Sequence, residues 1–340
     1  NPQGKHIASA AQIGVLDADN KFVKYPWLPD MNTPIFVFSD SHRFPEKELA
    51  EGQISIGKIP SSDITVRADL SQLIDYHTAV LGVTGTGKTE LVFDLINSAV
   101  DQGVKVFCVD FTGEYQARLA ARKPVSIGLD KAMADELDKR LFAGAEKTTL
   151  KKFVDEIIPV VGEQVETFLR EEGGAVGIFS LPEITNTKAT LRATELYLSS
   201  IMRWARAHRK ARRVMVVLEE AHTIIPETGG AGFDFETQWV VGRISQIALQ
   251  GRKYGVGLLV VSQRTALVSK SILSQCNTYF THSLIDRTSL EYLTNVYSSE
   301  HVKVIPNLRF LECLAYGKAI LSERPVIVRR EFDDSKREAS

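Results

Sequence analysis

The sequence predicts an α/β protein in which a sheet is flanked by helices, preceded by a small β-rich segment. From about residue 71, apolar runs of strand length alternate with longer helical stretches, which is the pattern of an α/β domain. A glycine-rich loop stands between the first of these runs and the first helix. Residues 1–70 are instead rich in proline and contain short β-like runs without long helical periodicity.

The expected elements can be given in chain order. Short strands are expected at 35–38 and 54–56. They are followed by strand 78–83, helix 88–102, strand 104–109, a charged helical region 131–172 that Pro159 and Gly162 break, strand 176–179, helix 189–209, strand 214–218, helix 238–250, strand 257–261, and weaker strands at 279–282, 312–316 and 326–328. In the first helix the apolar residues recur on one face, and Gly103 stands where a C-terminal cap is expected. We divide the chain into a β-rich segment with a linker (1–70), an α/β domain (71–330) and a polar tail (331–340).

Composition and charge exclude few classes of function. The contents of 44% apolar and 24% charged residues are those of an ordinary globular protein. A formal net charge of -1 and a pI near 6.7 provide no whole-molecule field for nucleic acid or an anionic membrane. A local basic channel stays open, because counterion release depends only on the Lys and Arg side chains that face phosphates.

The cysteines indicate a reducing environment. Cys108, Cys276 and Cys313 are far apart and form neither a C-x-x-C pair nor a plausible disulfide framework. We therefore expect a cytoplasmic protein. The longest apolar runs, such as 214–218, are far shorter than the roughly 18 residues of a membrane span, and no signal peptide is visible, so no membrane partner is expected. The chain opens on Asn1 rather than Met, which suggests that residues before it were removed.

The glycine-rich loop carries the strongest functional signal. Residues 82–89 read GVTGTGKT, the Walker A form G-x-x-x-x-G-K-[ST] of nucleoside triphosphate sites. Gly85 and Gly87 let backbone N–H groups turn inward around phosphate oxygens, and the next helix presents its positive end to them. Lys88 is expected to neutralise the β and γ phosphates, and the Thr89 hydroxyl to bind Mg²⁺. The residues expected to contact the nucleotide are Gly82, Val83, Thr84, Gly85, Thr86, Gly87, Lys88, Thr89 and Glu90.

Two other interpretations of this loop are less favourable. A chance glycine-rich turn would lack the strand before it and the helix after it that the pattern predicts here. A dinucleotide-binding loop would need a third glycine where Glu90 stands. Segment 71–330 is therefore predicted to be a P-loop ATPase domain with ATP and Mg²⁺ as its cofactors.

An acidic pair is expected to complete the site from a neighbouring strand. The segment VMVVLEEAH delivers Glu219 and Glu220 at the end of an apolar strand, which is the Walker B arrangement. Glu219 is expected to hold Mg²⁺, through water, and Glu220 to orient and deprotonate the attacking water. Asp is more usual at the first position, and acids at a strand end can also act only as a cap.

Two further polar residues end core strands. Asp110 follows the second strand of the domain, inside DFTGEY, and is a candidate active-site residue, although an Asp after a strand is often only a turn former. Gln263 ends the strand in VVSQR and is expected to contact the γ-phosphate or the lytic water, as a sensor that couples hydrolysis to movement would.

Together these motifs resemble the HerA branch of the HerA/FtsK superfamily of DNA-pumping ATPases. The resemblance rests on GVTGTGKT, DFTGEY, LEEAH, GRKYGVGLLVVSQR and ILSQCNT, and it covers about residues 54–328. It implies a RecA-like (ASCE) core, hexameric rings around double-stranded DNA, and an N-terminal barrel that docks a nuclease. That nuclease is NurA in archaea, and related bacterial systems pair HerA-like ATPases with sirtuin-type or other effectors in phage defence. Segment 1–70 is short for such a barrel and is at most a remnant of it.

The resemblance also assigns residues by position. Lys88, Thr89, Glu219 and Glu220 match the phosphate, magnesium and acidic positions, and Asp110 and Gln263 match polar active-site positions. Arg252, within GRKYG, is the first candidate for an arginine finger that reaches the nucleotide of a neighbouring subunit, and Arg243 is the second. The alternative for Arg252 is a surface arginine at a helix end, where a cation is favoured by the helix dipole.

Contacts to DNA are less well defined by the sequence. Residues 203–213 read RWARAHRKARR, in which Arg203, Arg206, Lys210 and Arg213 share one side at helical spacing. Such a run is more often the solvated face of an amphipathic helix. Lys270 and the glycine-rich loop 229–233 are the alternative candidates for a channel wall.

The function expected from these observations is a ring-forming, ATP-driven translocase or helicase on double-stranded DNA, with a nuclease or effector partner in DNA end processing or phage defence. An ATP-dependent switch that orders a scaffold for an effector, without pumping DNA, is the alternative. A GTPase is a third class, because residues 110–113 match D-x-x-G, but no N-K-x-D segment that reads guanine is present.

Overall fold

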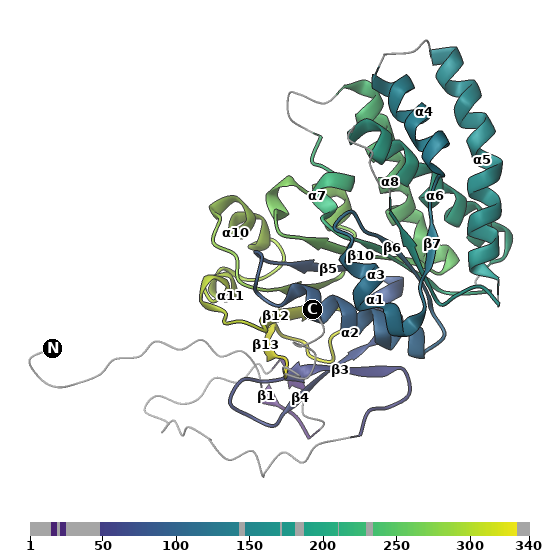
Figure 1. Cartoon of the computed structure of the whole chain (residues 1–340). Coiled ribbons are helices and arrows are strands. Elements are labelled where there is room, and N and C mark those ends of the chain that lie inside the picture. Colours follow the sequence, from purple (N-terminus) through teal and green to yellow (C-terminus); the bar gives the residue numbers. More distant parts are fainter. Residues whose placement is uncertain are drawn as a thin grey trace, which may run out of the picture.

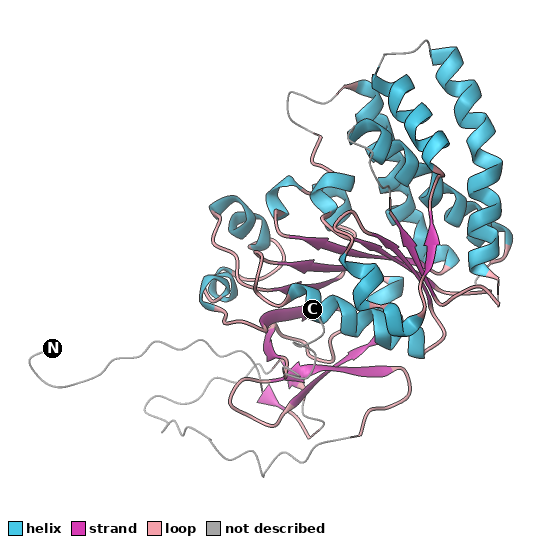
Figure 2. Ribbon diagram, in the orientation of Figure 1, coloured by secondary structure: helices cyan, strands magenta, loops and turns pink. Residues whose placement is uncertain are grey.

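The main body of the molecule is a mixed α/β sheet covered by helices (Figures 1 and 2). The computed structural model describes residues 15–18, 21–24, 48–142, 147–170, 172–180, 187–209, 211–228 and 234–331. The strand expected at 35–38, the glycine-rich loop 229–233 and the tail from residue 332 lie outside the described residues.

The predicted elements that fall within the described residues have bounds close to those expected, and the structure adds short strands and helices that the sequence did not predict. The strands are β1 (Val15–Leu16), β2 (Phe22–Val23), β3 (Gln53–Lys58), β4 (Thr65–Asp69), β5 (Thr78–Leu81), β6 (Lys105–Val109), β7 (Val125–Ile127), β8 (Val176–Phe179), β9 (Val214–Leu218), β10 (Val256–Ser262), β11 (Thr278–Thr281), β12 (Glu312–Gly317) and β13 (Val326–Arg329). The α-helices are α1 (Leu70–Asp75), α2 (Lys88–Asp101), α3 (Glu114–Arg118), α4 (Lys131–Phe142), α5 (Lys147–Leu169), α6 (Thr187–Ala207), α7 (Ala221–Ile224), α8 (Phe235–Gly251), α9 (Lys270–Leu273), α10 (Arg287–Leu293) and α11 (Ser299–Val302). The 3-10 helices are η2 (Ala120–Arg122), η3 (Arg252–Tyr254), η4 (Thr265–Leu267) and η5 (Ile305–Asn307).

The strand order brings the expected site strands to one edge of the sheet. Within the described residues the main sheet has the order β4-β3-β13-β12-β11-β5-β10-β9-β6-β8-β7. The run from β11 to β7 is parallel, and the pairings at β12, β13, β3 and β4 are antiparallel. Ser262 of β10 is in register with Leu81 of β5, and Val260 of β10 with Leu218 of β9. The carboxyl ends of β5, β10 and β9 therefore lie together.

The expectation that the P-loop strand and the acidic strand are neighbours was wrong. β10 hydrogen bonds to β5 on one side and to β9 on the other, so one strand separates them. Strand order is set by tertiary packing, and β10 follows β9 in the chain although it lies between β5 and β9 in space. The intervening strand carries Gln263 at its end, which places this residue between the loop and the acids.

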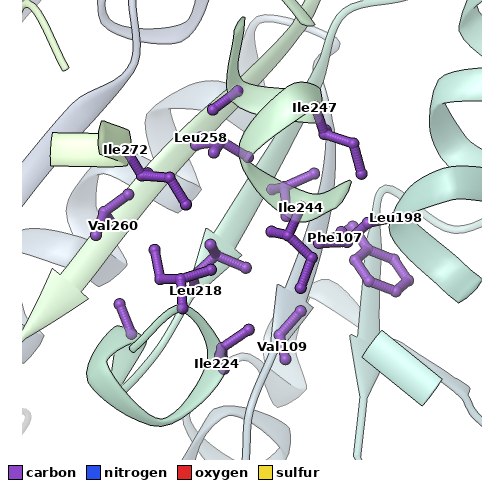
Figure 3. Packing of buried hydrophobic residues seen from close by; sticks show 14 of the residues in the cluster. Phe107, Val109, Leu198, Leu218, Ile224, Ile244, Ile247, Leu258, Val260 and Ile272 are labelled. Atoms are coloured by element: carbon purple, nitrogen blue, oxygen red, sulfur yellow. The ribbon is translucent and has the colours of Figure 1, made fainter. Parts of the chain in front are cut away.

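Helices cover the two faces of the sheet with separate apolar layers. Side chains alternate along β9, so that Val216 and Leu218 belong to one buried cluster and Met215 and Val217 to the other. Helices α4, α5, α6 and α8 lie together against the first face, and α1, α2 and α3 against the second (Figure 1). Figure 3 shows Ile244 of α8 among the strand side chains of the first face. Each fully buried Leu, Ile or Val stabilises the fold by about 1.5–3 kcal/mol.

The break expected at Pro159 and Gly162 in the charged helical region was wrong. Helix α5 begins at Lys147, continues through both residues and ends at Leu169, and α4 ends at Phe142. An interior proline costs a helix about 3 kcal/mol. The side chains that α5 buries on one stripe outweigh this cost because each contributes a comparable amount. They are Val154, Ile157, Val161, Val165 and Phe168.

The segment before residue 70 also contributes to the main sheet. β3 pairs with β4, and its Lys58 pairs with Arg329 of β13. The division of the chain at residue 70 stays a prediction. Among the described residues, no helix combines the length and the apolar character that crossing a membrane requires.

Candidate active site

The backbone of the P-loop adopts conformations that explain its glycines. Gly82, Gly85 and Gly87 have φ angles of 151°, 77° and 98°. A β-carbon at Gly82 would lie 2.6 Å from Cβ of His282, and one at Gly87 would lie 2.9 Å from Cδ2 of Leu311, so neither position has room for a side chain. At Gly85 a β-carbon would meet nothing within 4 Å, so that the loop is open on this side. This glycine is required for its positive φ and not for lack of space.

The loop is held by hydrogen bonds from three neighbouring segments. The N–H of Gly82 donates to the carbonyl of Ser262 (3.3 Å), and that of Val83 to the carbonyl of Ser283 (3.0 Å). The carbonyl of Thr86 accepts from the N–H of Leu311 (3.0 Å) and lies 3.1 Å from Nδ1 of His282. The loop is thus fixed by the ends of β10 and β11 and by the segment before β12.

Lys88 points into the loop and lies within the field of both acids. It is the first residue of α2, it is buried, and its Nζ donates to the carbonyl of Val83 (2.8 Å). Burial lowers the pKa of Lys88, while the charges of Glu219 and Glu220 raise it. Thr89 is half-buried in the first turn of α2. Glu90 accepts from Arg118 (2.6 Å), an ion pair on the outer side of this turn.

Glu219 is buried and oriented by a tyrosine. Its exposed fraction is 9%, and its Oε2 accepts from the hydroxyl of Tyr115 at 2.5 Å. Burial raises its pKa to about 6, against the lowering effects of the Tyr115 hydrogen bond and of Lys88. Tyr115 was not singled out from the sequence, although it closes the DFTGEY motif. This carboxylate has a fixed direction, as a metal ligand needs.

Glu220 is connected to the P-loop through Gln263. Nε2 of Gln263 donates to Oε1 of Glu220 (2.6 Å), and Oε1 of Gln263 accepts from the hydroxyl of Thr84. Nδ1 of His222 lies 3.2 Å from the other oxygen of Glu220. Glu220 itself has φ 47° and ψ 49°, a left-handed conformation that is uncommon for a residue with a side chain and is concentrated at functional sites. The structure therefore brings Glu220 and Gln263 together at the loop.

Asp110 acts on this site through its neighbours. It is buried, and its carboxylate accepts from the backbone N–H groups of Thr112 (2.8 Å), Gly113 (3.1 Å) and Tyr115 (3.0 Å). Both oxygens are therefore used to form the turn before α3. This turn positions Tyr115, whose hydroxyl holds Glu219. The turn-forming interpretation describes its contacts, and any direct role for Asp110 in catalysis stays a prediction.

Comparisons with known proteins show which proteins this chain is similar to. The family described as "Helicase HerA, central domain" matches residues 54–168, which include the P-loop. A probable helicase of Methanocaldococcus jannaschii is 22% identical in an alignment that covers 91% of this chain and 72% of that protein. The DNA double-strand break repair helicase HerA of Saccharolobus solfataricus is 22% identical, with 97% of this chain and 79% of that protein covered. Over most of its length the chain is similar to HerA-like helicases, and the matched family segment contains its P-loop.

Solved structures share the fold of this HerA-like chain. VirB4 of Thermoanaerobacter pseudethanolicus has a TM-score of 0.61 at 14% identity, with 85% of this chain and 99% of that chain covered. The bacterial conjugative coupling protein TrwB has a TM-score of 0.53 at 13% identity, with 84% and 90% covered. The expected fold class, a P-loop sheet flanked by helices, is confirmed.

The two candidate arginine fingers of the HerA-like chain lie away from its own P-loop. Arg252 precedes β10, and Tyr76, which it contacts, precedes β5, so both stand at the amino edge of the parallel strands. The P-loop leaves the opposite, carboxyl edge. Arg243 lies on α8, where it pairs with Glu195 of α6 (3.3 Å). Neither arginine is brought to the acids of its own chain, and a role for either in trans stays a prediction.

The DNA-contact candidates are also spread over the surface. Arg203, Arg206 and Arg213 are exposed, and Arg213 pairs with Asp75 (3.5 Å). The backbone N–H of Lys270 donates to Glu227 (2.8 Å) at the start of α9. The contacts of these residues leave their predicted role in a DNA channel untested.

Proposed function

We propose that this HerA-like ATPase forms rings and uses ATP hydrolysis to move along double-stranded DNA. In this proposal the ring is a hexamer, each subunit binds ATP with Mg²⁺, and the protein works in the cytoplasm with a nuclease or a sirtuin-type effector. DNA end processing or phage defence is the process that such a pair would serve. The buried free thiols of Cys108, Cys276 and Cys313 fit a reducing compartment.

The observation that carries the proposal is the chain of contacts from Thr84 through Gln263 to Glu220. Thr84 belongs to the loop that would surround the phosphates, and Glu220 is the carboxylate placed to accept the proton of the attacking water. Gln263 ends the strand between them. Loss of the terminal phosphate would therefore change the contacts of Gln263 at the end of β10. This strand begins just after η3, which contains Arg252, at the other edge of the sheet. This is a physical route from hydrolysis to movement.

The remaining site residues have complementary roles in this chemistry. Lys88 would leave the carbonyl of Val83 and neutralise the β and γ phosphates. Among the described residues, no group of three or more His, Cys, Asp or Glu side chains could hold a metal ion by itself. This agrees with Mg²⁺ in nucleotide sites, which is bound by one or two protein side chains together with phosphates and water. Thr89 and Glu219 would hold it here, and the ion would withdraw charge from the phosphates.

The names and folds of similar proteins support DNA as the substrate. The Saccharolobus relative is a DNA double-strand break repair helicase, and TrwB is a conjugative coupling protein. Both comparisons cover most of this chain. In the alternative function, a switch, ATP only orders a scaffold for an effector, and the nucleotide site is the same. The effect of DNA on ATP turnover distinguishes the switch from the translocase.

The test is steady-state ATP hydrolysis by the full chain with and without long linear duplex DNA. We expect duplex DNA to raise turnover several-fold and single-stranded DNA to raise it less, with Lys88→Ala as the control for contaminating ATPase. Turnover that duplex DNA leaves unchanged would favour the switch and would contradict the translocase. Mass photometry with and without ATP and DNA tests the ring directly, because a translocating hexamer requires six-subunit particles.

A further inference from the structure

Three segments that are distant in sequence meet at the amino edge of the sheet. Tyr76 lies between α1 and β5, Arg252 begins η3, and Lys318 follows β12. The N–H of Asn277 donates to the carbonyl of Tyr76 (2.9 Å), and the N–H of Lys318 donates to the carbonyl of Asn277 (2.9 Å). A β-carbon at Gly317 would lie 2.1 Å from the latter oxygen, so only glycine permits this approach. The backbone therefore fixes where Lys318 begins.

A buried histidine fixes Tyr76 relative to Arg252. His77 has φ 52°, a left-handed conformation that costs a residue with a side chain about 1–2 kcal/mol. Its Nδ1 accepts from the N–H of Leu258 (3.0 Å), so its Nε2 carries the proton and donates to the carbonyl of Ala248 (2.5 Å). These bonds tie the residue after Tyr76 to the end of α8 and to β10, which flank Arg252. Strained conformations of this kind persist where the surroundings impose them.

Two cations share the ring of Tyr76. The guanidinium carbon of Arg252 lies 3.8 Å from the ring centroid and Nζ of Lys318 lies 3.6 Å from it. Nη2 of Arg252 also donates to the Tyr76 hydroxyl. Lys318 forms a hydrogen bond with the same hydroxyl, which is the main cause of a lowered Tyr76 pKa. Both cations are exposed.

This arrangement of charges lacks an anion. Within the part of the chain that the structure describes, neither Arg252 nor Lys318 forms a salt bridge, and the nearby Asp75 is paired with Arg213 (3.5 Å). An aromatic face attracts each cation but does not remove the repulsion between the two. A phosphate group placed against both would do so, because guanidinium presents a planar fork to its oxygens and an ammonium adds a compact charge.

We propose that Arg252 and Lys318 form one oxyanion receptor, aligned by Tyr76, that takes the terminal phosphate of the nucleotide bound by a neighbouring subunit. This inference rests on the proposed ring. The P-loop of the same chain leaves the opposite edge of the sheet, so the phosphate must belong to another copy. Both cations lie close to the centroid of the same ring, at 3.8 and 3.6 Å. Such a compact pair suits one phosphate group better than the row of phosphates along a DNA strand. Lys318 is thereby a second catalytic cation, and Tyr76 is a positioning residue.

Single variants test the two new roles by ATP turnover without DNA. Lys318→Ala is expected to lower kcat by roughly tenfold to a hundredfold, because it removes a charge that acts on the developing transition state. Tyr76→Leu removes the ring and is expected to lower kcat with little change in KM. Tyr76→Phe keeps the ring and should retain most of the activity. If the hydroxyl were what matters at this position, Tyr76→Phe would lose as much activity as Tyr76→Leu. Lys303→Ala, an exposed lysine paired with Glu300 on α11, is the control.

A mixed-subunit experiment decides whether Lys318 acts in trans. Lys318→Ala subunits retain the P-loop, and Lys88→Ala subunits retain the receptor, so their shared interfaces contain one complete site. In a ring with head-to-tail contacts, an equal mixture gives about one quarter of interfaces in the productive order. We expect ATP turnover near that fraction of the wild-type value, well above either parent. Thermal melting and mass photometry of each variant exclude loss of fold or of assembly.

Several results would overturn the receptor. Unchanged turnover in Lys318→Ala would remove this lysine from the site, and loss without recovery in the mixture would show an effect within one subunit. Unchanged turnover accompanied by weaker duplex binding and a shallower salt dependence would assign the two cations to DNA. The proposed translocase can be contradicted separately. If the mixture recovers ATP turnover but duplex DNA does not stimulate the wild type, the result supports the receptor and contradicts the DNA function.

Discussion

At the carboxyl edge of the sheet Lys88, Glu219 and Glu220 are buried or half-buried and contact partners in their own chain. At the amino edge two cations are exposed and contact one phenol ring. Lys88 is held by the carbonyl of Val83 and Glu219 by Tyr115. Arg252 and Lys318 share Tyr76 instead. A buried charge must be paired and fixed, because desolvation is costly. An exposed charge is solvated by water and needs no partner in its own chain before a ligand binds.

The difference suggests a division of work between the two edges. In the proposed function, the residues that hold the nucleotide and activate water all come from one chain. The cations that would stabilise charge on the terminal phosphate come from the other edge and act only when a second copy is placed against it. Hydrolysis would then depend on assembly, which a motor in a ring requires.

The largest expected effects come from one residue of each edge. Arg252→Ala should lower ATP turnover by about a thousandfold, as the loss of an arginine finger does. Glu220→Gln should lower it by a few hundredfold while ATP binding is kept, because an amide cannot accept the proton of water. Steady-state turnover and calorimetric titration with ATP measure the two quantities.

Mixing each of these variants with Lys88→Ala sharpens the contrast. Arg252→Ala should recover activity in the mixture, since its intact P-loop can meet an intact arginine from the partner. Glu220→Gln should not recover, because every P-loop in that mixture lacks either Lys88 or the base. Recovery of Glu220→Gln, or none for Arg252→Ala with rings intact, would contradict the assignment of the two edges.

A pH effect on stability is expected from a histidine at the carboxyl edge. Burial, together with Lys88, lowers the pKa of His282 from its ordinary value of 6.5 to about 4. Below about pH 6.5 the imidazole is therefore protonated in the unfolded chain but stays neutral in the folded chain. The contribution of neutral His282 to the free energy of unfolding is present above pH 6.5 and is lost as pH falls towards 4. The difference corresponds to about 3 kcal/mol.

Chemical denaturation at several pH values measures this contribution. The free energy of unfolding should fall less steeply between pH 6.5 and 4 in His282→Gln than in the wild type. His208→Gln, at an exposed position beyond α6, is the matched control. Identical pH profiles for the wild type and His282→Gln would show that the imidazole is not held neutral beside the P-loop.

The smallest effect concerns the tyrosine that orients Glu219. Tyr115→Phe removes the hydroxyl that donates to this carboxylate and should raise the Mg²⁺ concentration for half-maximal turnover by about tenfold, as the loss of an outer-shell partner does. Tyr297→Phe removes a buried hydroxyl that contacts Thr281 and Leu314 and is the matched control. An unchanged Mg²⁺ requirement in Tyr115→Phe would separate Glu219 from the metal.

The sequence predicted well what short motifs and repeating patterns encode. Strands at 176–179 and 214–218 were placed at their observed bounds, because continuous apolar runs of this length lie in the buried sheet. The P-loop was found because its chemistry is carried by adjacent residues. The break at Pro159 was wrong, since local helix propensity was outweighed by the apolar stripe that α5 buries.

Contacts between distant residues could not be predicted in this way. Tyr115 and Glu219 are 104 positions apart, and Tyr76 and Arg252 are 176 apart. No local pattern links such pairs, because their meeting depends on strand order and on the turns at both edges. The position of β10 between β5 and β9 is one feature that tertiary packing sets. It is the reason that Gln263 lies between the loop and the acids.

The sequence by itself determined the phosphate loop, the two acids and the alternation of strands and helices, because each depends on neighbours along the chain. Only the tertiary structure decided that Tyr115 directs Glu219, that Gln263 joins Thr84 to Glu220, and that Arg252 stands with Lys318 on the opposite edge. The physical reason is that side-chain geometry in a sheet is set by packing and register across strands, which no run of adjacent residues records.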